Sequence, residues 1–319
     1  MSLPDIKALS RRTALALLAA GAACGPRPLG THERLGEVRV GSEGISGQGG
    51  TTLALSRWAP AGRPRAMILA LHGYGDTART TYARAARSWA DAGILTYAYD
   101  HRGFGENPTR RQWPGAEVLS ADAVAVANAL RARHPGLPQT VVGHSMGGGV
   151  ALAAAGEGLQ ADALVLAAPA IAGGRQLSPV LRAGGWTLGA FAPNRRFTGE
   201  GVVSLQPSDN IDAMRAASAS PWHYADASGR ELWGLVRVSD RAARAAARVK
   251  VPTLTLMGAK DEYIPRGAVE AVHRSIPGAR AFVVYPEGWH WLFRDLQAPA
   301  VWNDVRDFAL SAPASDVRP

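Results

Sequence analysis

A serine lies between two glycines in the run Gly143-His144-Ser145-Met146-Gly147, which fits the pattern G-x-S-x-G. Residues 139–142 before it are β-branched and apolar and predict a buried strand, whereas residues 148–155 predict a helix. A serine on such a turn projects its hydroxyl out of the sheet and lies at the positive end of the helix. The context favours a catalytic nucleophile, Ser145, over a glycine-rich turn with an idle serine.

A serine hydroxyl becomes a useful nucleophile only when a base removes its proton. His290 follows the last predicted strand, in a loop that can reach the sheet edge, and it is the predicted general base. A carboxylate must hold the histidine tautomer and stabilise its positive charge. Asp261, in the loop after the strand predicted at 253–257, is preferred, and its neighbour Glu262 is the rival.

The same reaction needs N–H donors for the negative oxygen of the tetrahedral intermediate. The backbone N–H of Met146, directly after the serine, is one predicted donor. The backbone N–H of Tyr74, in the loop after the strand predicted at 66–71, is the second. His72 in that loop and His144 beside the serine are interpreted as structural supports.

The elements that must position these residues alternate along the chain. Strands are predicted at residues 51–58, 66–71, 94–99, 139–142, 163–167, 253–257 and 281–285. Helices are predicted at 80–92, 119–130, 148–155, 268–275 and 299–310. This alternation predicts an α/β fold with a mostly parallel sheet covered on both faces, with the site at the carboxyl ends of its strands.

The motifs together resemble one branch of a known superfamily. His72-Gly73-Tyr74-Gly75, residues 100–105, the serine turn and the loops of Asp261 and His290 resemble the monoacylglycerol lipase or lysophospholipase branch of the α/β-hydrolases, over residues 50–310. The resemblance implies an eight-stranded hydrolase sheet with an inserted helical cap after the sixth strand. It also implies the chain order serine, aspartate, histidine, ester hydrolysis without metal or organic cofactor, and a bracing role for residues 100–105.

The expected organisation follows from these elements. Residues 1–24 are predicted as a signal peptide, 25–50 as a tether with the first edge strand, and 51–169 as the first part of the hydrolase core. Residues 170–250 break the strand–helix rhythm and are the predicted cap. Residues 251–312 complete the core, and 313–319 form a tail.

The amino terminus combines the parts of an export signal. Lys7, Arg11 and Arg12 precede a short apolar run over residues 14–23, which fits a signal peptide better than a membrane span. Cys24 closes the run in a context that resembles a bacterial lipobox, so we expect lipidation, membrane anchoring and a location in the bacterial cell envelope. Cleavage near residues 20–22, which would give a periplasmic or secreted protein, and an uncleaved helix are the alternatives.

The predicted cap is rich in large apolar side chains. The candidate residues for an acyl-chain pocket are Trp186, Phe191, Phe197, Met214, Trp222 and Trp233. The alternative is ordinary packing of the cap on the core. Arg237, Arg241, Arg244 and Arg248 recur at helical spacing and form either a surface for anionic lipid headgroups or a solvated face.

Composition narrows the function classes. The chain has 319 residues, 47% of them hydrophobic, which suffices for a large core. Its net charge of +9 comes from scattered arginines without a dense basic run, so nucleic-acid binding is disfavoured. The single cysteine excludes an internal disulfide, and no cluster has metal-ligand spacing.

The resulting prediction is a serine hydrolase that cleaves carboxylic esters, with monoacylglycerols or lysophospholipid-like lipids as substrates. A serine nucleophile argues against dehalogenation and epoxide opening. Acyl transfer, peptidase action and perhydrolysis could use the same three residues. A surface lipoprotein that only binds lipid is the alternative from another class.

Overall fold

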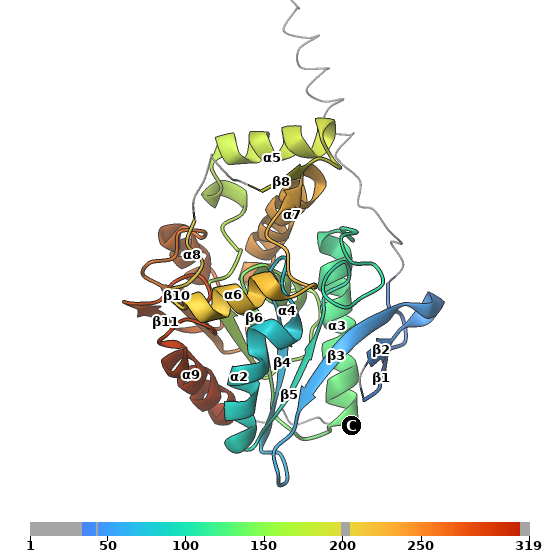
Figure 1. Cartoon of the computed structure of the whole chain (residues 1–319). Helices are drawn as coiled ribbons and strands as arrows, with labels where there is room; N and C mark the ends of the chain where they lie inside the picture. Colours follow the sequence, from blue (N-terminus) through green and yellow to red (C-terminus); the bar gives the residue numbers. More distant parts are fainter. Residues whose placement is uncertain (1–33, 43, 199–204, 313–319) are drawn as a thin grey trace, which may run out of the picture.

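A computed structural model describes residues 34–42, 44–198 and 205–312 (Figure 1). The predictions for residues 1–24, including Cys24, and for the tail at 313–319 lie outside these ranges. No helix within the described ranges is long and apolar enough to cross a membrane.

The described residues form a nine-stranded sheet in the order β1-β2-β3-β5-β4-β6-β7-β10-β11. Its strands are β1 (Arg39–Val40), β2 (Gly44–Ser46), β3 (Thr52–Trp58), β4 (Ala66–Leu71), β5 (Ile94–Tyr99), β6 (Gln139–His144), β7 (Ala163–Ala167), β10 (Thr253–Gly258) and β11 (Ala279–Tyr285). Neighbours from β5 to β11 are parallel, whereas β1, β2 and β3 join antiparallel at one edge. The expected α/β-hydrolase sheet is therefore present, with one more strand than expected, because the short β1 extends the edge beyond β2.

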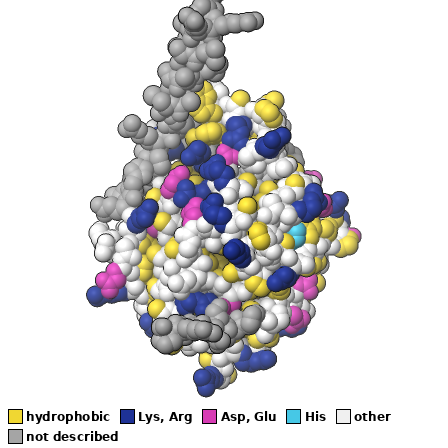
Figure 2. All heavy atoms as spheres, turned by 180° about the vertical axis from the view of Figure 1, so that it is seen from behind, with side chains coloured by type: hydrophobic (Ala, Val, Ile, Leu, Met, Phe, Trp, Pro, Cys, Tyr) yellow, Lys and Arg dark blue, Asp and Glu magenta, His cyan; other side chains and the backbone are white. Residues whose placement is uncertain are grey.

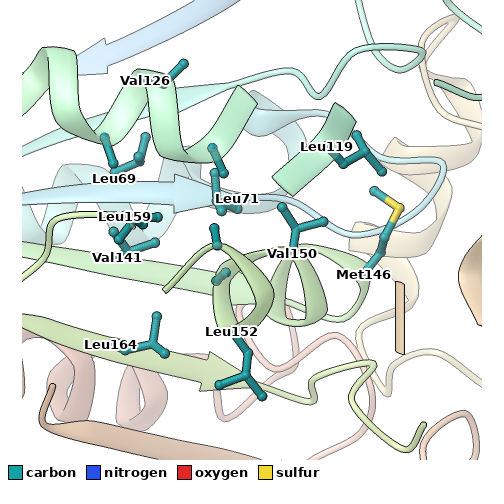
Figure 3. Close-up of a cluster of buried hydrophobic side chains, with 14 of the residues drawn as sticks. Leu69, Leu71, Leu119, Val126, Val141, Met146, Val150, Leu152, Leu159 and Leu164 are labelled. Atoms are coloured by element: carbon teal, nitrogen blue, oxygen red, sulfur yellow. The ribbon is translucent and has the colours of Figure 1, made fainter. Parts of the chain in front are cut away.

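The central strands are buried on both faces, and alternate side chains enter different cores. Leu69 and Leu71 of β4 pack in one cluster, and Ile68 and Ala70 of the same strand pack in the other. Figure 3 shows the first cluster, in which Leu69, Leu71 and Val141 of the sheet meet side chains from the helices that follow β5 and β6. Continuous apolar strands such as 66–71 thus need a helical layer on each side.

Five helices supply those layers. α2 (Ala78–Asp91) and α9 (Ala298–Ser311) cover one face, and α3 (Ala116–Arg133), α4 (Met146–Ala155) and α8 (Arg266–His273) cover the other. α2 begins two residues before the predicted start at 80, because the Thr77 hydroxyl accepts a hydrogen bond from the N–H of Thr80 and caps the helix. The layers place the amino end of α4 at the carboxyl edge of the sheet.

The chain between β7 and β10 forms a cap above that edge. It contains α5 (Pro179–Phe191), β8 (Arg196–Phe197), α6 (Ile211–Ala219), β9 (Ala227–Ser228) and α7 (Gly229–Ala245), with β8 and β9 paired antiparallel. Figure 1 shows α5 as the outermost helix, beyond α7. Counted from β2, β7 is the sixth strand, which is where the resemblance places the insertion.

Candidate active site

Ser145 occupies the sharp turn between β6 and α4. Its backbone has φ 53° and ψ −120°, a conformation that a residue with a side chain rarely adopts. The turn is tight because a side chain at Gly143 would collide with the backbone of Gly147, and one at Gly147 would collide with the Leu71 carbonyl. Packing of β6 against α4 maintains this strained backbone conformation, which keeps the serine hydroxyl pointing away from the sheet.

The three residues predicted from sequence meet at this turn. Nε2 of His290 lies 2.9 Å from Oγ of Ser145, and Nδ1 of His290 lies 2.9 Å from Oδ2 of Asp261. Because the Asp261 carboxylate accepts the Nδ1 proton, Nε2 is left free to accept the serine proton. The geometry is that of a nucleophile, a base and the carboxylate that orients the base.

Asp261 is held as an anion. Burial raises its pKa, but His290 and the hydrogen bonds at its oxygens outweigh burial, so the pKa lies below its usual value. Its Oδ1 accepts the N–H groups of Tyr263 at 2.8 Å and Ile264 at 3.0 Å. The rival Glu262 points elsewhere and accepts the N–H of Gln206 at 2.7 Å. The structure therefore brings Asp261, and not Glu262, to the histidine.

Two other histidines support the site as structural residues. Burial and the nearby His290 lower the pKa of His144 to about 3, so its ring is neutral. Its Nε2–H can donate to the carbonyl of His290 at 2.8 Å, which fixes the histidine loop. Nδ1 of His72 lies 2.7 Å from the carbonyl of Gly73, and its Nε2 accepts the N–H of His101 at 2.9 Å. His72 thereby links the loop of Tyr74 to the bracing loop after β5.

The two predicted oxyanion donors lie beside the serine. Tyr74 follows β4, Met146 is the first residue of α4, and both line the cavity that contains Ser145. Within the described residues, neither backbone N–H donates to a protein acceptor. The lack of a side chain at Gly73 lets the two loops approach each other, since a Cβ there would lie 3.2 Å from the Cβ of Ser145. Two N–H groups are thus available for a developing oxyanion.

A cavity of about 630 Å³ extends from Ser145 under the cap. Its apolar wall is built mainly by two cap helices, with Met214 from α6 and Leu232, Leu235 and Val236 from α7. The three α7 residues share one face of that helix. Tyr263, Ile264 and Trp291 close the side near His290.

The predicted acyl pocket is corrected for five of its six residues, because only Met214 lines this cavity. Trp186 packs against Phe191 on α5, and Phe191 is 79% exposed. Trp233 lies beside Gly185 of α5, next to Val236, but unlike Val236 it does not line the cavity. Phe197 packs under the guanidinium of Arg195, and Trp222 packs under that of Arg110. These aromatics serve the packing and surface of the cap.

A buried polar cluster beside the serine was not predicted. Asp76 forms an ion pair with Arg294, and His223 lies 3.8 Å from Asp76. Burial raises the pKa of Asp76, but Arg294 and His223 outweigh burial and hold it well below its usual value. The Arg294 guanidinium lies over the Trp291 ring at 3.6 Å. Only folding could reveal this cluster, because its members come from three separate loops.

The cap also holds the histidine loop in place. Residues 205–210, called the cap strap below, run beside the loop that contains His290. The Ser208 hydroxyl donates to Asp295 at 2.6 Å, and the same carboxylate accepts the N–H of Trp289 at 2.8 Å. The N–H of Trp291 donates to the carbonyl of Pro207 at 2.8 Å. The strap thereby fixes the residues on both sides of the histidine.

The four cap arginines lie along α7 and the turn after it, and the structure shows acidic partners for two of them. Arg241 donates to Glu157 at 3.0 Å, and Arg237 and Arg241 both lie 3.5 Å from Glu117. Arg248 donates to the carbonyl of Gly156 at 3.0 Å. Figure 2 shows acidic side chains interspersed among the Lys and Arg on the face opposite that of Figure 1. These contacts favour a structural and solvated role for the stripe.

The parallel sheet, the strained serine turn and the Ser145–His290–Asp261 chain at its carboxyl edge define a serine hydrolase of the α/β-hydrolase class. Residues 62–297 match the model of the family described as "Serine aminopeptidase, S33". The chain therefore belongs to this family of α/β-hydrolases.

Relatives within the class include lipases. The chain is 30% identical to a monoacylglycerol lipase of Mycolicibacterium smegmatis, over 84% of this chain and 96% of the relative. It is 27% identical to the monoglyceride lipase of Homo sapiens, over 78% and 82% of the two chains. The solved monoacylglycerol lipase of Paleococcus ferrophilus has the same fold, with a TM-score of 0.67 at 21% identity over 82% and 99%. Family and relatives identify the chain as a carboxylic ester hydrolase.

Proposed function

We propose that this chain hydrolyses monoacylglycerols or lysophospholipid-like lipids through an acyl-enzyme on Ser145. The observation that carries the proposal is the hydrogen-bonded chain of Ser145, His290 and Asp261, which opens into a cavity with an apolar wall and a polar corner. The lipases among the relatives support the same substrate class.

The reaction proceeds in two acyl transfers. Ser145 Oγ attacks the ester carbonyl while Nε2 of His290 takes its proton, and Asp261 stabilises the resulting imidazolium. The N–H groups of Tyr74 and Met146 hold the oxyanion. Collapse of the intermediate expels the alcohol, which takes the proton from His290. Water then attacks the acyl-enzyme with His290 again as base, and the fatty acid leaves as Ser145 regains its proton.

The shape of the cavity suits a lipid with one acyl chain. Its volume of about 630 Å³ lies within the range of sites for a single small ligand, about 300–1,000 Å³. The wall of Met214, Leu232, Leu235 and Val236 offers apolar surface to the chain. Asp76 and His223 lie in the same cavity and offer hydrogen-bonding groups to the hydroxyls of a polar alcohol. One chain and one polar head define a monoacyl lipid.

The experiment that tests the substrate is a hydrolysis panel with the purified protein. Monoacylglycerols and lysophospholipids should be cleaved with higher kcat/KM than triacylglycerols, because a cavity of about 630 Å³ is small for three acyl chains. A fluorophosphonate probe should label the folded protein at Ser145. Peptide cleavage or acyl transfer without ester hydrolysis, or an unlabelled folded protein, would contradict the proposal.

The apolar wall can be tested by filling it. Met214→Trp should reduce kcat/KM for long-chain p-nitrophenyl esters of about twelve carbons roughly tenfold and leave esters of about four carbons nearly unchanged, because the larger ring shortens the cavity. Ile211→Trp is the matched control, since Ile211 lies on the same helix and is 50% exposed. Equal losses for both chain lengths would place the acyl chain elsewhere.

We also propose that the protein is exported to the bacterial cell envelope, anchored through a lipidated Cys24. The support is the sequence of residues 1–24, with its basic start, apolar run and terminal cysteine. Mass spectrometry of the mature amino terminus from a membrane fraction tests this proposal. A diacylated Cys24 is the expected result, and a terminus without lipid at any residue would overturn the anchoring.

A further inference from the structure

We propose that Tyr263 is a positioning residue for His290, and that its ring stabilises the imidazolium that forms during each acyl transfer. The proposal rests on the proposed function and adds a residue to it. Tyr263 lies two positions after Asp261, in the loop that follows β10, and it lines the cavity that contains Ser145.

The two rings are stacked. Their centroids lie 4.6 Å apart and their planes differ by 23°. The backbone N–H of Tyr263 also donates to Oδ1 of Asp261 at 2.8 Å. One residue therefore contacts both the acid and the base, through its backbone and its ring. A shift of this loop would move the carboxylate and the stacked ring together.

The ring of Tyr263 is held from its far end as well. Its hydroxyl donates to the carbonyl of Leu205 at 3.2 Å, which is the first residue of the cap strap. The tyrosine thus lies between the strap and the imidazole. Although its side chain is 40% exposed, it has contacts at its backbone, its ring face and its hydroxyl. Such a side chain has little freedom to turn away from His290.

The faces of the His290 ring are available for a further stabilising contact. Ser145 and Asp261 occupy both ring nitrogens, and an aromatic ring can still stabilise the imidazole by packing on one of its faces. An aromatic face attracts a cation, and a parallel ring at this distance is suited to do so. Because the imidazole gains a positive charge when it takes the serine proton, this attraction lowers the barrier.

Other titratable groups also face the imidazole. They are Asp261 from the loop after β10, His144 from β6 and Asp295 from the loop after His290. His144 is neutral, as described above, and Asp261 is charged. Burial raises the pKa of Asp295 to about 6, against the hydrogen bonds from Ser208 and Trp289. Variants of Tyr263 leave Asp261, His144 and Asp295 in place. A change in the pH profile of such a variant can therefore be assigned to Tyr263.

The test compares the ring with the hydroxyl. Tyr263→Leu removes the ring, and Tyr263→Phe removes only the hydroxyl. With a short p-nitrophenyl ester, Tyr263→Leu should lower kcat about tenfold, change KM less than about twofold, and move the acid limb of the kcat/KM profile to lower pH. Tyr263→Phe should keep kcat within about twofold and keep the acid limb in place.

A matched control uses a histidine away from the site. Phe282 packs edge-to-face on His273 at 5.3 Å, and neither residue lines the cavity. Phe282→Leu should leave kcat and the acid limb unchanged. Tyr263→Met serves as a second ring-free variant if Tyr263→Leu does not fold, as judged by circular dichroism.

Each outcome decides the proposal. An unchanged acid limb and kcat in Tyr263→Leu would overturn it, and so would a loss in Tyr263→Phe as large as that in Tyr263→Leu. Labelling of the unaltered protein by a fluorophosphonate separates the two proposals. If the unaltered protein is labelled and active but kcat and the acid limb are unchanged in Tyr263→Leu, only the role of Tyr263 is contradicted. If the unaltered protein is not labelled, the proposed function itself is contradicted.

Discussion

Ser145→Ala is expected to lower kcat for ester hydrolysis by about 10⁴- to 10⁶-fold, because the attacking oxygen that contacts His290 is removed. Hydrolysis of p-nitrophenyl esters and labelling by a fluorophosphonate measure it. Activity near that of the unaltered protein would remove Ser145 from the reaction.

The fold of this variant should be intact, which separates lost chemistry from lost structure. The serine hydroxyl contacts His290 but contributes nothing to the core, and its backbone bonds, such as that from its N–H to the carbonyl of Ala167 at 3.0 Å, remain. Ser145→Gly should also be inactive and should gain about 1 kcal/mol of stability, because glycine adopts a positive φ without strain. Thermal unfolding of the variants checks both statements. A large drop in Tm for Ser145→Ala would show that the turn depends on the hydroxyl.

Asp261→Asn is the second large effect, with an expected drop in kcat of about 10⁴-fold. The reason lies in the two oxygens of the carboxylate. Oδ1 accepts two backbone N–H groups, so an asparagine must place its oxygen there and its NH₂ group toward His290. That NH₂ donates to Nδ1, which forces the ring proton onto Nε2. The Nε2 atom then has no lone pair for the serine proton.

The control for this variant is the neighbouring carboxylate. Glu262→Gln should retain most of the activity, because Glu262 accepts a hydrogen bond from Gln206 and does not reach the histidine. Steady-state kinetics of both variants at neutral pH make the comparison. A greater loss in Glu262→Gln than in Asp261→Asn would reverse the assignment of the acid.

The unfolding free energy of Asp261→Asn should depend less on pH than that of the unaltered protein. The pKa of Asp261 is lower in the folded protein than its usual value, so the carboxylate stabilises the fold above the usual pKa and loses this contribution as the pH falls through the folded value. Asp261→Asn removes that contribution, and its unfolding free energy should therefore depend less on pH in the acid range. Denaturant unfolding at several pH values measures the difference.

Sequence patterns predicted the core well, because local signals there coincide with the fold. Apolar runs such as 66–71 could be buried on both faces only in a central strand, and Gly143 and Gly147 bracketed Ser145 as a tight turn requires. The loop positions of Asp261 and His290 followed from the strands before them. The structure places the side chains of Ser145 and Asp261 each within hydrogen-bonding distance of His290.

The cap was predicted only as a segment. Its large side chains occur on several faces of α5 and α7, and the sequence does not state how either helix is turned about its axis. Docking of α7 turned Leu232 and Leu235 to the cavity and Trp233 toward α5, with Val236 bordering both. The acyl pocket predicted from sequence was therefore wrong for all of its residues but Met214.

By itself the sequence determined the α/β fold, the serine turn and the three residues, Ser145, His290 and Asp261, that meet at it. These depend on periodicity and on residues close to strand ends, which a linear pattern contains. Only the tertiary structure decided the shape of the acyl cavity, the buried cluster of Asp76 and Arg294, and the ring of Tyr263 on His290. Those features join residues from distant loops, and their contacts exist only once helix packing has fixed the angle and rotation of each element.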